Sequence, residues 1–198
     1  MITTIDNAVD SLEQMAAAGE RTDPLAAKAA LWWGWHAVVL LAHHRLRPAR
    51  DTFDHWFWDY LEAGEPALDV DRDARWEERQ RLSLVQLLDV LSEEQLPILE
   101  PQFYQGWQDR GTRCRTLRLR AAEAVGTSIG GPARERLLFL LAAYHRLLRM
   151  PAPAEVDLDQ VRADLPVLLD LAASLVDRSH EQAKPVMAAI ERCRSSLG

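Results

Sequence analysis

The order of apolar and polar residues along the chain is typical of helices. No segment alternates between apolar and polar residues for long enough to indicate a strand, whereas residues that start and stop helices recur throughout. The sequence therefore predicts an all-α protein: a compact bundle of about seven or eight helices with no sheet.

The first two helices have the clearest signals. One helix is expected over about 6–18, where Gly19 ends it. Asp23 then supplies an N-cap and Pro24 occupies the first helical position, which predicts a long helix that must end before Pro48.

The later helices are predicted from amphipathic stretches, caps and prolines. They cover about 51–63, the segment from about 71 through RLSLVQLLDVL, a short helix at the capping box of Ser92, about 112–125, a helix opened by Pro132 that ends before the PAP linker at 151–153, and two closing helices capped by Asp157 and Ser179. Pro166 and Pro185 in the closing helices predict late starts or kinks.

Composition and length indicate one domain. Of the 198 residues, 48% are apolar and 27% charged, which is enough apolar surface for a core. We expect a single helical domain over 1–198. Residues 97–111 are the least regular part of the chain, and a subdivision is most easily placed there.

Several features bear on the cellular location. The first residues, MITTIDNAVDSLEQ, have no basic start followed by an apolar stretch, and the longest apolar run, 29–42, is too short to cross a membrane. Cys114 and Cys193 have no partner at metal-ligand spacing. The sequence thus predicts a cytoplasmic protein with no membrane partner, no metal and no cofactor.

Aromatic residues and histidines are concentrated in one region. Five of the seven tryptophans and four of the six histidines lie between residues 32 and 58. On the long helix, Trp32, His36, Val39 and His43 share a face, and two histidines seven residues apart are about 10 Å apart, too far to chelate one ion by themselves. We therefore expect these histidines in a core or in a dimer seam.

Two tryptophans do not lie on the main apolar stripe of their helices. They are Trp33, on the long helix, and Trp58, on the helix expected over 51–63. Because tryptophan is enriched at protein interfaces, both are candidate interface residues of a homodimer.

The helix over 51–63 also carries His55, Asp59 and Glu62 on one face. Such a set could serve a metal site in a bundle and a metal-dependent hydrolase, but it would need matching ligands from facing helices. The sequence offers no Glu-x-x-His elsewhere, so a solvated face is the preferred interpretation.

One stretch resembles a known family. The segment ALWWGWHAVVLLAHHRL resembles the aromatic-aromatic-x-x-His helix of HEPN-type helical domains, and residues 50–55 match the Arg-polar-x-x-x-His pattern of their ribonuclease members. The resemblance implies paired subunits that cleave RNA without metal. It assigns His55 as general acid or base, Arg50 as the group that stabilises phosphate charge, and Asp51 as the residue that orients them.

The net charge of −7 is unevenly distributed. The segment 61–100 contains 11 acidic and 4 basic residues, whereas 101–150 contains 9 basic and 3 acidic residues. The basic segment includes five arginines with no acid among them: Arg110, Arg113, Arg115, Arg118 and Arg120. They could bind the phosphates of RNA or DNA, or they could pair with the acidic segment within one subunit or across a dimer.

The sequence has no motif that decides the function. A phosphate loop and a dinucleotide fingerprint are both absent from it. The preferred interpretation is a binding or regulatory protein that acts as a homodimer through its aromatic-rich helical surface. The alternatives are a nucleic-acid-directed protein that uses the arginine segment and a HEPN-like metal-independent ribonuclease.

Overall fold

The computed structural model describes residues 2–46, 88, 91–92, 123, 125–126, 128–148 and 155–197. In these residues the chain forms five α-helices and no strand, apart from a single bridge between Ser92 and Ile129. The all-α class is therefore confirmed. Other predicted helices, including those at 51–63 and 71–91, lie largely or wholly outside the described residues.

The chain divides into two compact units. The first consists of 1–45 and 130–198, and the second of 46–129. Within the second unit, Leu88, Leu91 and Val125 are buried, and the backbone N–H of Ile129 donates to the carbonyl of Leu91 at 2.8 Å. The predicted irregular stretch at 97–111 lies outside the described residues.

Helix α1 spans Thr4–Gly19 and starts two residues before the predicted position. Its N-cap is Thr3, whose hydroxyl accepts a hydrogen bond from the backbone N–H of Asp6 at 3.1 Å, while the Asp6 carboxylate accepts from the Thr3 N–H at 2.8 Å. This reciprocal capping box satisfies two backbone donors at the helix start. The predicted end at Gly19 is confirmed.

Helix α2 spans Pro24–Leu46, as the punctuation predicts. The carboxylate of Asp23 accepts a hydrogen bond from the backbone N–H of Leu25 at 3.0 Å, which is the capping role expected of it.

Helix α7 spans Gly131–Leu148 and helix α8 spans Leu158–Leu175. The predicted cap of α8 is confirmed, because Asp157 accepts from the backbone N–H of Gln160 at 2.9 Å. Pro166 lies inside α8, so the expectation of a late start is wrong for this helix, and the alternative of a kink stays a prediction.

Helix α9 spans Ala183–Leu197, and the prediction that Ser179 caps it is wrong. The backbone N–H and the hydroxyl of Ser179 both donate to the Asp177 carboxylate, at 3.1 and 2.7 Å. Ser179 therefore closes a turn around a stronger acceptor, and the helix starts later, with Pro185 in its first turn as the proline predicts.

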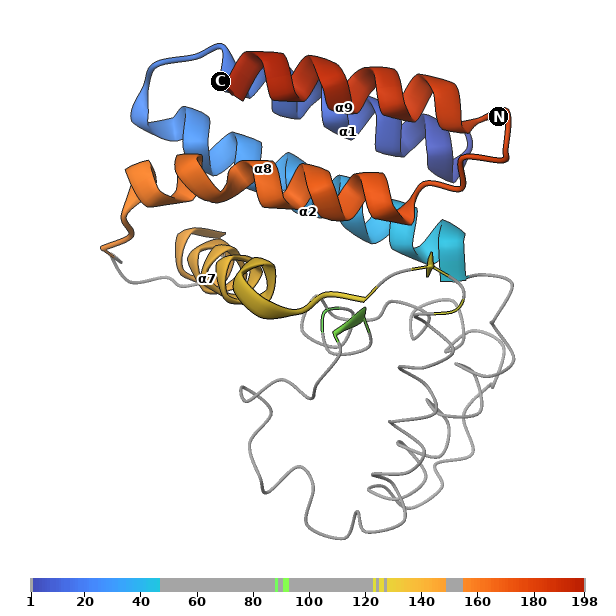
Figure 1. Ribbon diagram of the computed structural model, residues 1–198. Coiled ribbons are helices and arrows are strands. Elements are labelled where there is room, and N and C mark those ends of the chain that lie inside the picture. Colours follow the sequence, from blue (N-terminus) through green and yellow to red (C-terminus); the bar gives the residue numbers. More distant parts are fainter. Residues whose placement is uncertain are drawn as a thin grey trace, which may run out of the picture. The chain divides into compact units, whose positions relative to one another are not determined.

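Four helices form two hairpins that pack side by side. The first hairpin is α1–α2 and the second is α8–α9, with α1 against α9 and α8 beside α2 (Figure 1). Contacts link the starts of α2 and α8, where Arg162 donates to the Asp23 carbonyl at 3.0 Å, and their ends, where Arg45 pairs with Asp177 at 2.6 Å. Helices α2 and α8 are therefore parallel.

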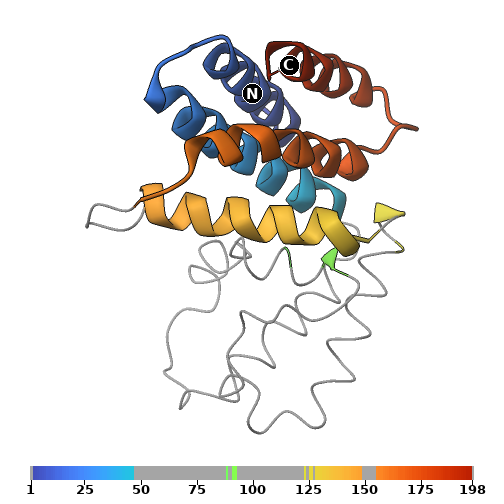
Figure 2. The ribbon, with the colours of Figure 1, turned by 60° about the vertical axis from the view of Figure 1, so that its left-hand side comes forward.

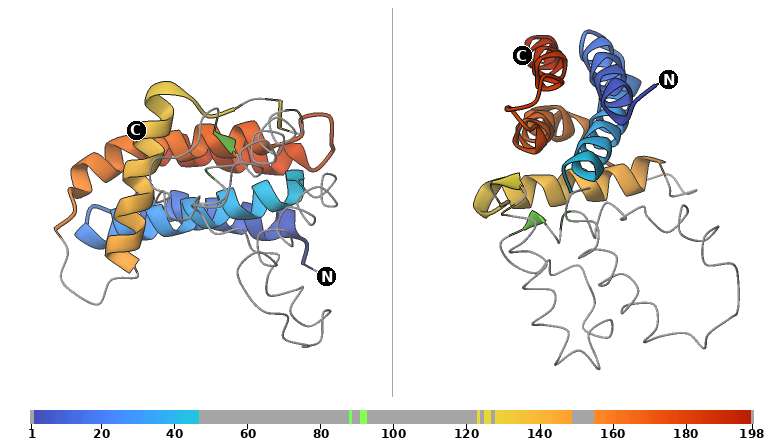
Figure 3. Two further views of the ribbon diagram at one scale, coloured as in Figure 1. Left: turned by 90° about the horizontal axis from the view of Figure 1, so that it is seen from below. Right: turned by 90° about the vertical axis from the view of Figure 1, so that its right-hand side faces the viewer.

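Helix α7 crosses the other four. It lies below the layer of α2 and α8 and runs across their axes (Figure 2 and the left view of Figure 3). The Trp35 indole is buried, and its N–H points to the Leu140 carbonyl at 3.4 Å, which ties α7 to α2.

The core lies between these layers. The largest fully buried side chains of the first unit include Leu12 and Met15 from α1, Leu31, Trp35 and Leu41 from α2, Leu137, Leu140 and Leu141 from α7, and Leu165 from α8. Each helix thus contributes an apolar face, and these faces hold α2 in a fixed orientation.

Candidate interaction surface

Helix α2 has one buried half and one exposed half. The buried half faces α1, α7 and α8 and includes Ala26, Ala27, Ala30, Leu31, Trp35, Ala37, Val38, Leu41 and Ala42. The opposite half carries Leu25, Lys28, Trp32, His36 and Val39, which we call the α2 stripe. These five positions are three or four residues apart, so they lie on one side of the helix.

The α2 stripe exposes large apolar side chains. Leu25 is 62% exposed and Trp32 is 42% exposed, His36 is also exposed, and Lys28 and Val39 are half-buried. An exposed leucine alone would be ordinary, but an exposed tryptophan seven residues further along gives the same helix face two exposed apolar side chains, with Lys28 between them.

The ring of Trp32 is held by a neighbouring helix. It stacks on Tyr144 of α7 with 5.9 Å between ring centroids and 23° between ring planes. Tyr144 is only 8% exposed, so its ring is fixed by the core and supports one face of the indole. Trp32 is therefore both accessible and preorganised, a combination that favours binding.

His36 is fixed by a hydrogen bond to the first helix. Its Nδ1 lies 2.8 Å from the hydroxyl oxygen of Ser11, and that hydroxyl donates to the Asn7 carbonyl at 2.7 Å. Because the hydroxyl proton is used by Asn7, Ser11 accepts from Nδ1–H of His36. The pair is not a catalytic dyad, since the serine is 1% exposed and directs its proton away from the imidazole.

Trp33 contacts the same imidazole. It is half-buried, and its ring meets His36 edge-on with 6.0 Å between centroids. Trp33 therefore lies beside the α2 stripe, and its interface role stays a prediction.

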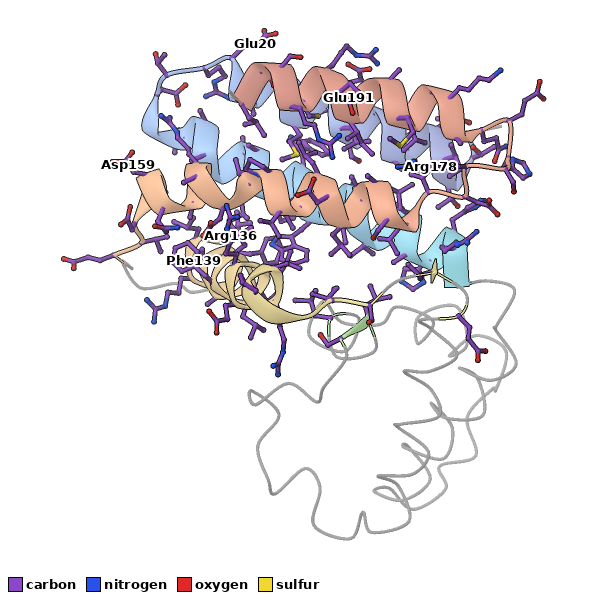
Figure 4. All side chains as sticks on the ribbon, in the orientation of Figure 1. Glu20, Arg136, Phe139, Asp159, Arg178 and Glu191 are labelled. Carbon is purple, nitrogen blue, oxygen red and sulfur yellow. The ribbon has the colours of Figure 1, made fainter. Side chains whose placement is uncertain are left out.

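A buried carboxylate positions α7 on α8. The Asp164 side chain is 5% exposed and pairs with Nε of Arg136, and it also accepts from Nε2 of Gln160 at 2.8 Å. The same guanidinium donates to the Ala163 carbonyl at 2.9 Å. Figure 4 labels the Arg136 side chain on α7.

The cysteine of α9 has no sign of reactivity. Cys193 is fully buried, and its thiol donates to the Leu12 carbonyl at 2.9 Å. Burial is the main cause that raises the pKa of Cys193 to about 11, so the thiol stays protonated at neutral pH. Its contact with α1 is structural.

Two other kinds of site, a metal centre and a membrane span, have little support in the described part of the chain. No group of three or more His, Cys, Asp or Glu residues is arranged there to hold a metal ion. By length and composition alone, Leu25–Arg45 could cross a membrane, but 56% of this stretch is buried inside the protein, as in the core helix of a soluble protein. The stretch is therefore weak support for a membrane span.

The structure corrects the predicted orientation of the long helix. The face with Trp32 and His36 is not a core face, because both side chains are exposed. The alternative, a seam between subunits, stays a prediction. The error arises because α2 is apolar on nearly all sides, so its sequence pattern does not distinguish the buried face from the exposed one.

The other predicted site residues lie outside the described residues. They are Arg50, Asp51 and His55 of the HEPN-like motif, Arg110, Arg113, Arg115, Arg118 and Arg120 of the basic segment, and Trp58.

Sequence reasoning missed the contact between Asp164 and Arg136, although α8 carries a signal for it. Asp164 falls among the buried positions Val161, Leu165 and Leu168 of an otherwise apolar stripe. A carboxylate in a core position predicts a cationic or hydrogen-bonding partner from a facing helix.

Comparison of the chain with protein-family models, with curated proteins and with solved structures gives no match.

Proposed function

We propose that this protein is a helical binding protein and that the α2 stripe is its interaction surface. The observation that carries the proposal is the exposure of Leu25 and Trp32 on a helix whose opposite half forms the core. Burying apolar surface of this kind contributes about 25 cal/mol per Å².

The support for a binding surface comes from the rigidity of its anchor. Interface hot spots are enriched in tryptophan, and an anchor that is already fixed loses less conformational entropy on binding. Tyr144 holds the Trp32 ring from α7, and Ser11 holds the His36 ring from α1.

Site-specific photo-crosslinking tests the proposal. Benzoylphenylalanine replaces Leu25, Trp32 or, as a control, Ala17, which is exposed on α1. After irradiation in the native host, we expect a discrete adduct from positions 25 and 32 and none from position 17. Adducts from all three positions, or from none, would contradict the proposal.

The same irradiation of the purified protein addresses the homodimer predicted from the sequence. A covalent dimer formed through position 32 would identify a second copy as the occupant of the stripe. The arginine and histidine residues predicted for the nucleic-acid and ribonuclease alternatives lie outside the described part of the chain.

A further inference from the structure

We infer that the α2 stripe receives an acidic amphipathic helix from a different protein. This inference rests on the proposed binding function and adds the chemistry of the partner. It is carried by the charge of α2 and by the spacing of the exposed residues.

Helix α2 contains no carboxylate. Between residues 24 and 46 there is no Asp or Glu, and the two full positive charges are Lys28 and Arg45. Arg45 is paired with Asp177 at 2.6 Å, whereas Lys28 forms no ion pair with any residue that the structure describes. Lys28 is thus a positive charge on the α2 stripe that a partner carboxylate can neutralise.

The lysine is close to the apolar anchors. Lys28 lies one turn before Trp32 and one turn after Leu25 on the same side of the helix. A partner that covers both apolar side chains must therefore also cover the ammonium group. Burying an ammonium without a partner is costly, so the covering surface needs an acidic group at this point.

The spacing between the two exposed apolar residues of the α2 stripe fits a partner that is itself a helix. Leu25 and Trp32 are seven residues apart, which is about 10 Å along the axis. A helix that lies along α2 presents apolar side chains with the same spacing at its own positions i and i+7, with polar residues on its flanks.

The same charge argument disfavours two other partners, the α2 helix of a second copy and a nucleic acid. A second copy that packed α2 against α2 would place each Lys28 on a helix without carboxylates. A nucleic acid would need several phosphate-binding cations, whereas the α2 stripe contains one lysine. An acidic helix pairs the lysine and covers the tryptophan together.

Two synthetic helical peptides provide the test. Both carry leucines at positions i, i+3 and i+7, and their flanks consist of Glu in one peptide and Lys in the other. Fluorescence anisotropy with the full-length protein measures each affinity. We expect the Glu peptide to bind about tenfold more tightly, and we expect this preference to shrink as salt is raised.

The chain offers a matched control, because its only other lysine is Lys184, which is exposed on α9. Lys28→Glu should abolish or reverse the preference for the Glu peptide, whereas Lys184→Glu should leave it unchanged. A preference that survives Lys28→Glu, or that Lys184→Glu removes equally, overturns the inference.

The remaining outcomes separate the inference from the proposed function. If both peptides bind equally and Trp32→Ala abolishes both, the α2 stripe is a binding surface and the acidic partner is wrong. If neither peptide binds, or if sedimentation shows a dimer that Trp32→Ala dissociates, the acidic partner is also wrong. In each case the crosslinking result decides the proposed function separately.

Discussion

At the residue scale, the turn between α8 and α9 is organised by one carboxylate. Hydrogen bonds from the hydroxyl and the backbone N–H of Ser179, followed by the pairing with Arg45, lower the pKa of Asp177 to about 2 from an ordinary value of 3.8. Because the pKa of Asp177 is lower in the folded protein, its ionised carboxylate stabilises the folded state. This contribution to the free energy of unfolding is present above about pH 4 and is lost as the pH falls toward 2.

Ser179→Ala should raise the pKa of Asp177, since the largest cause of its depression is the Ser179 hydroxyl. NMR titration of the side-chain carboxyl carbon measures the change directly. Ser195→Ala is the matched control, because that hydroxyl donates to the Glu191 carbonyl and not to a carboxylate. An unchanged Asp177 titration in Ser179→Ala would show that the hydroxyl is not the cause.

At the element scale, one arginine fixes the crossing of α7 over α8. Arg136→Met would leave the buried Asp164 carboxylate without its cation and the Ala163 carbonyl without a side-chain donor. We expect the free energy of unfolding to fall by about 1.5–3 kcal/mol, as for the loss of hydrogen bonds to a charged group. Urea unfolding followed by circular dichroism measures the difference.

Arg146→Met is the control for this prediction. Arg146 lies on the same helix, is exposed and forms no ion pair with the residues that the structure describes. If both variants lose the same stability, the pairing with Asp164 is not what holds α7 in place.

The local signals in the sequence predicted helix boundaries better than helix faces. Asp23 and Asp157 cap α2 and α8 as expected, because capping depends on residues within one turn of the cap. The start of α1 was missed by two residues because Thr3 caps it, and Ser179 was misassigned because Asp177 accepts its donors. The exposed face of α2 depends on which helices surround it, and those contacts are not local.

At the scale of the whole helical unit, Gly34 sets how closely three helices approach. A Cβ atom at this position would lie 3.0 Å from Cδ1 of Leu168 on α8 and 3.1 Å from Sδ of Met15 on α1. Glycine inside a helix costs about 1 kcal/mol relative to alanine. At position 34 this lower helix propensity accompanies a close approach of α2 to α1 and α8.

Gly34→Leu should therefore destabilise the protein, although leucine is the better helix former. Overpacking of a filled core costs about 1–3 kcal/mol, which exceeds the gain in propensity. Thermal unfolding should show a lower midpoint for Gly34→Leu than for the control Ala17→Leu, which adds the same side chain at an exposed position of α1. An equal or higher midpoint would mean that the three helices can separate without cost.

The long-range arrangement could not be predicted from the sequence. Hairpins with short loops were foreseeable at 20–23 and 176–182, but the parallel pairing of α2 with α8 joins segments more than a hundred residues apart. The contact of Arg162 with Asp23 depends on that pairing, and the contact of Arg192 with Glu13 depends on the pairing of α1 with α9. Neither contact has a periodic signal in the sequence.

The pairing of α1 with α9 has a consequence for synthesis. Helix α1 is synthesised before its partner α9, and the buried Cys193 thiol, which donates to the Leu12 carbonyl, lies 181 residues further along the chain. Protein synthesis adds about 5–20 residues per second, so α9 is made on the order of ten seconds after α1. The apolar side chains of α1, such as Leu12, lack the cover of α9 during that time. Chaperones that bind apolar segments therefore have that interval in which to act on the part of α1 that α9 later covers.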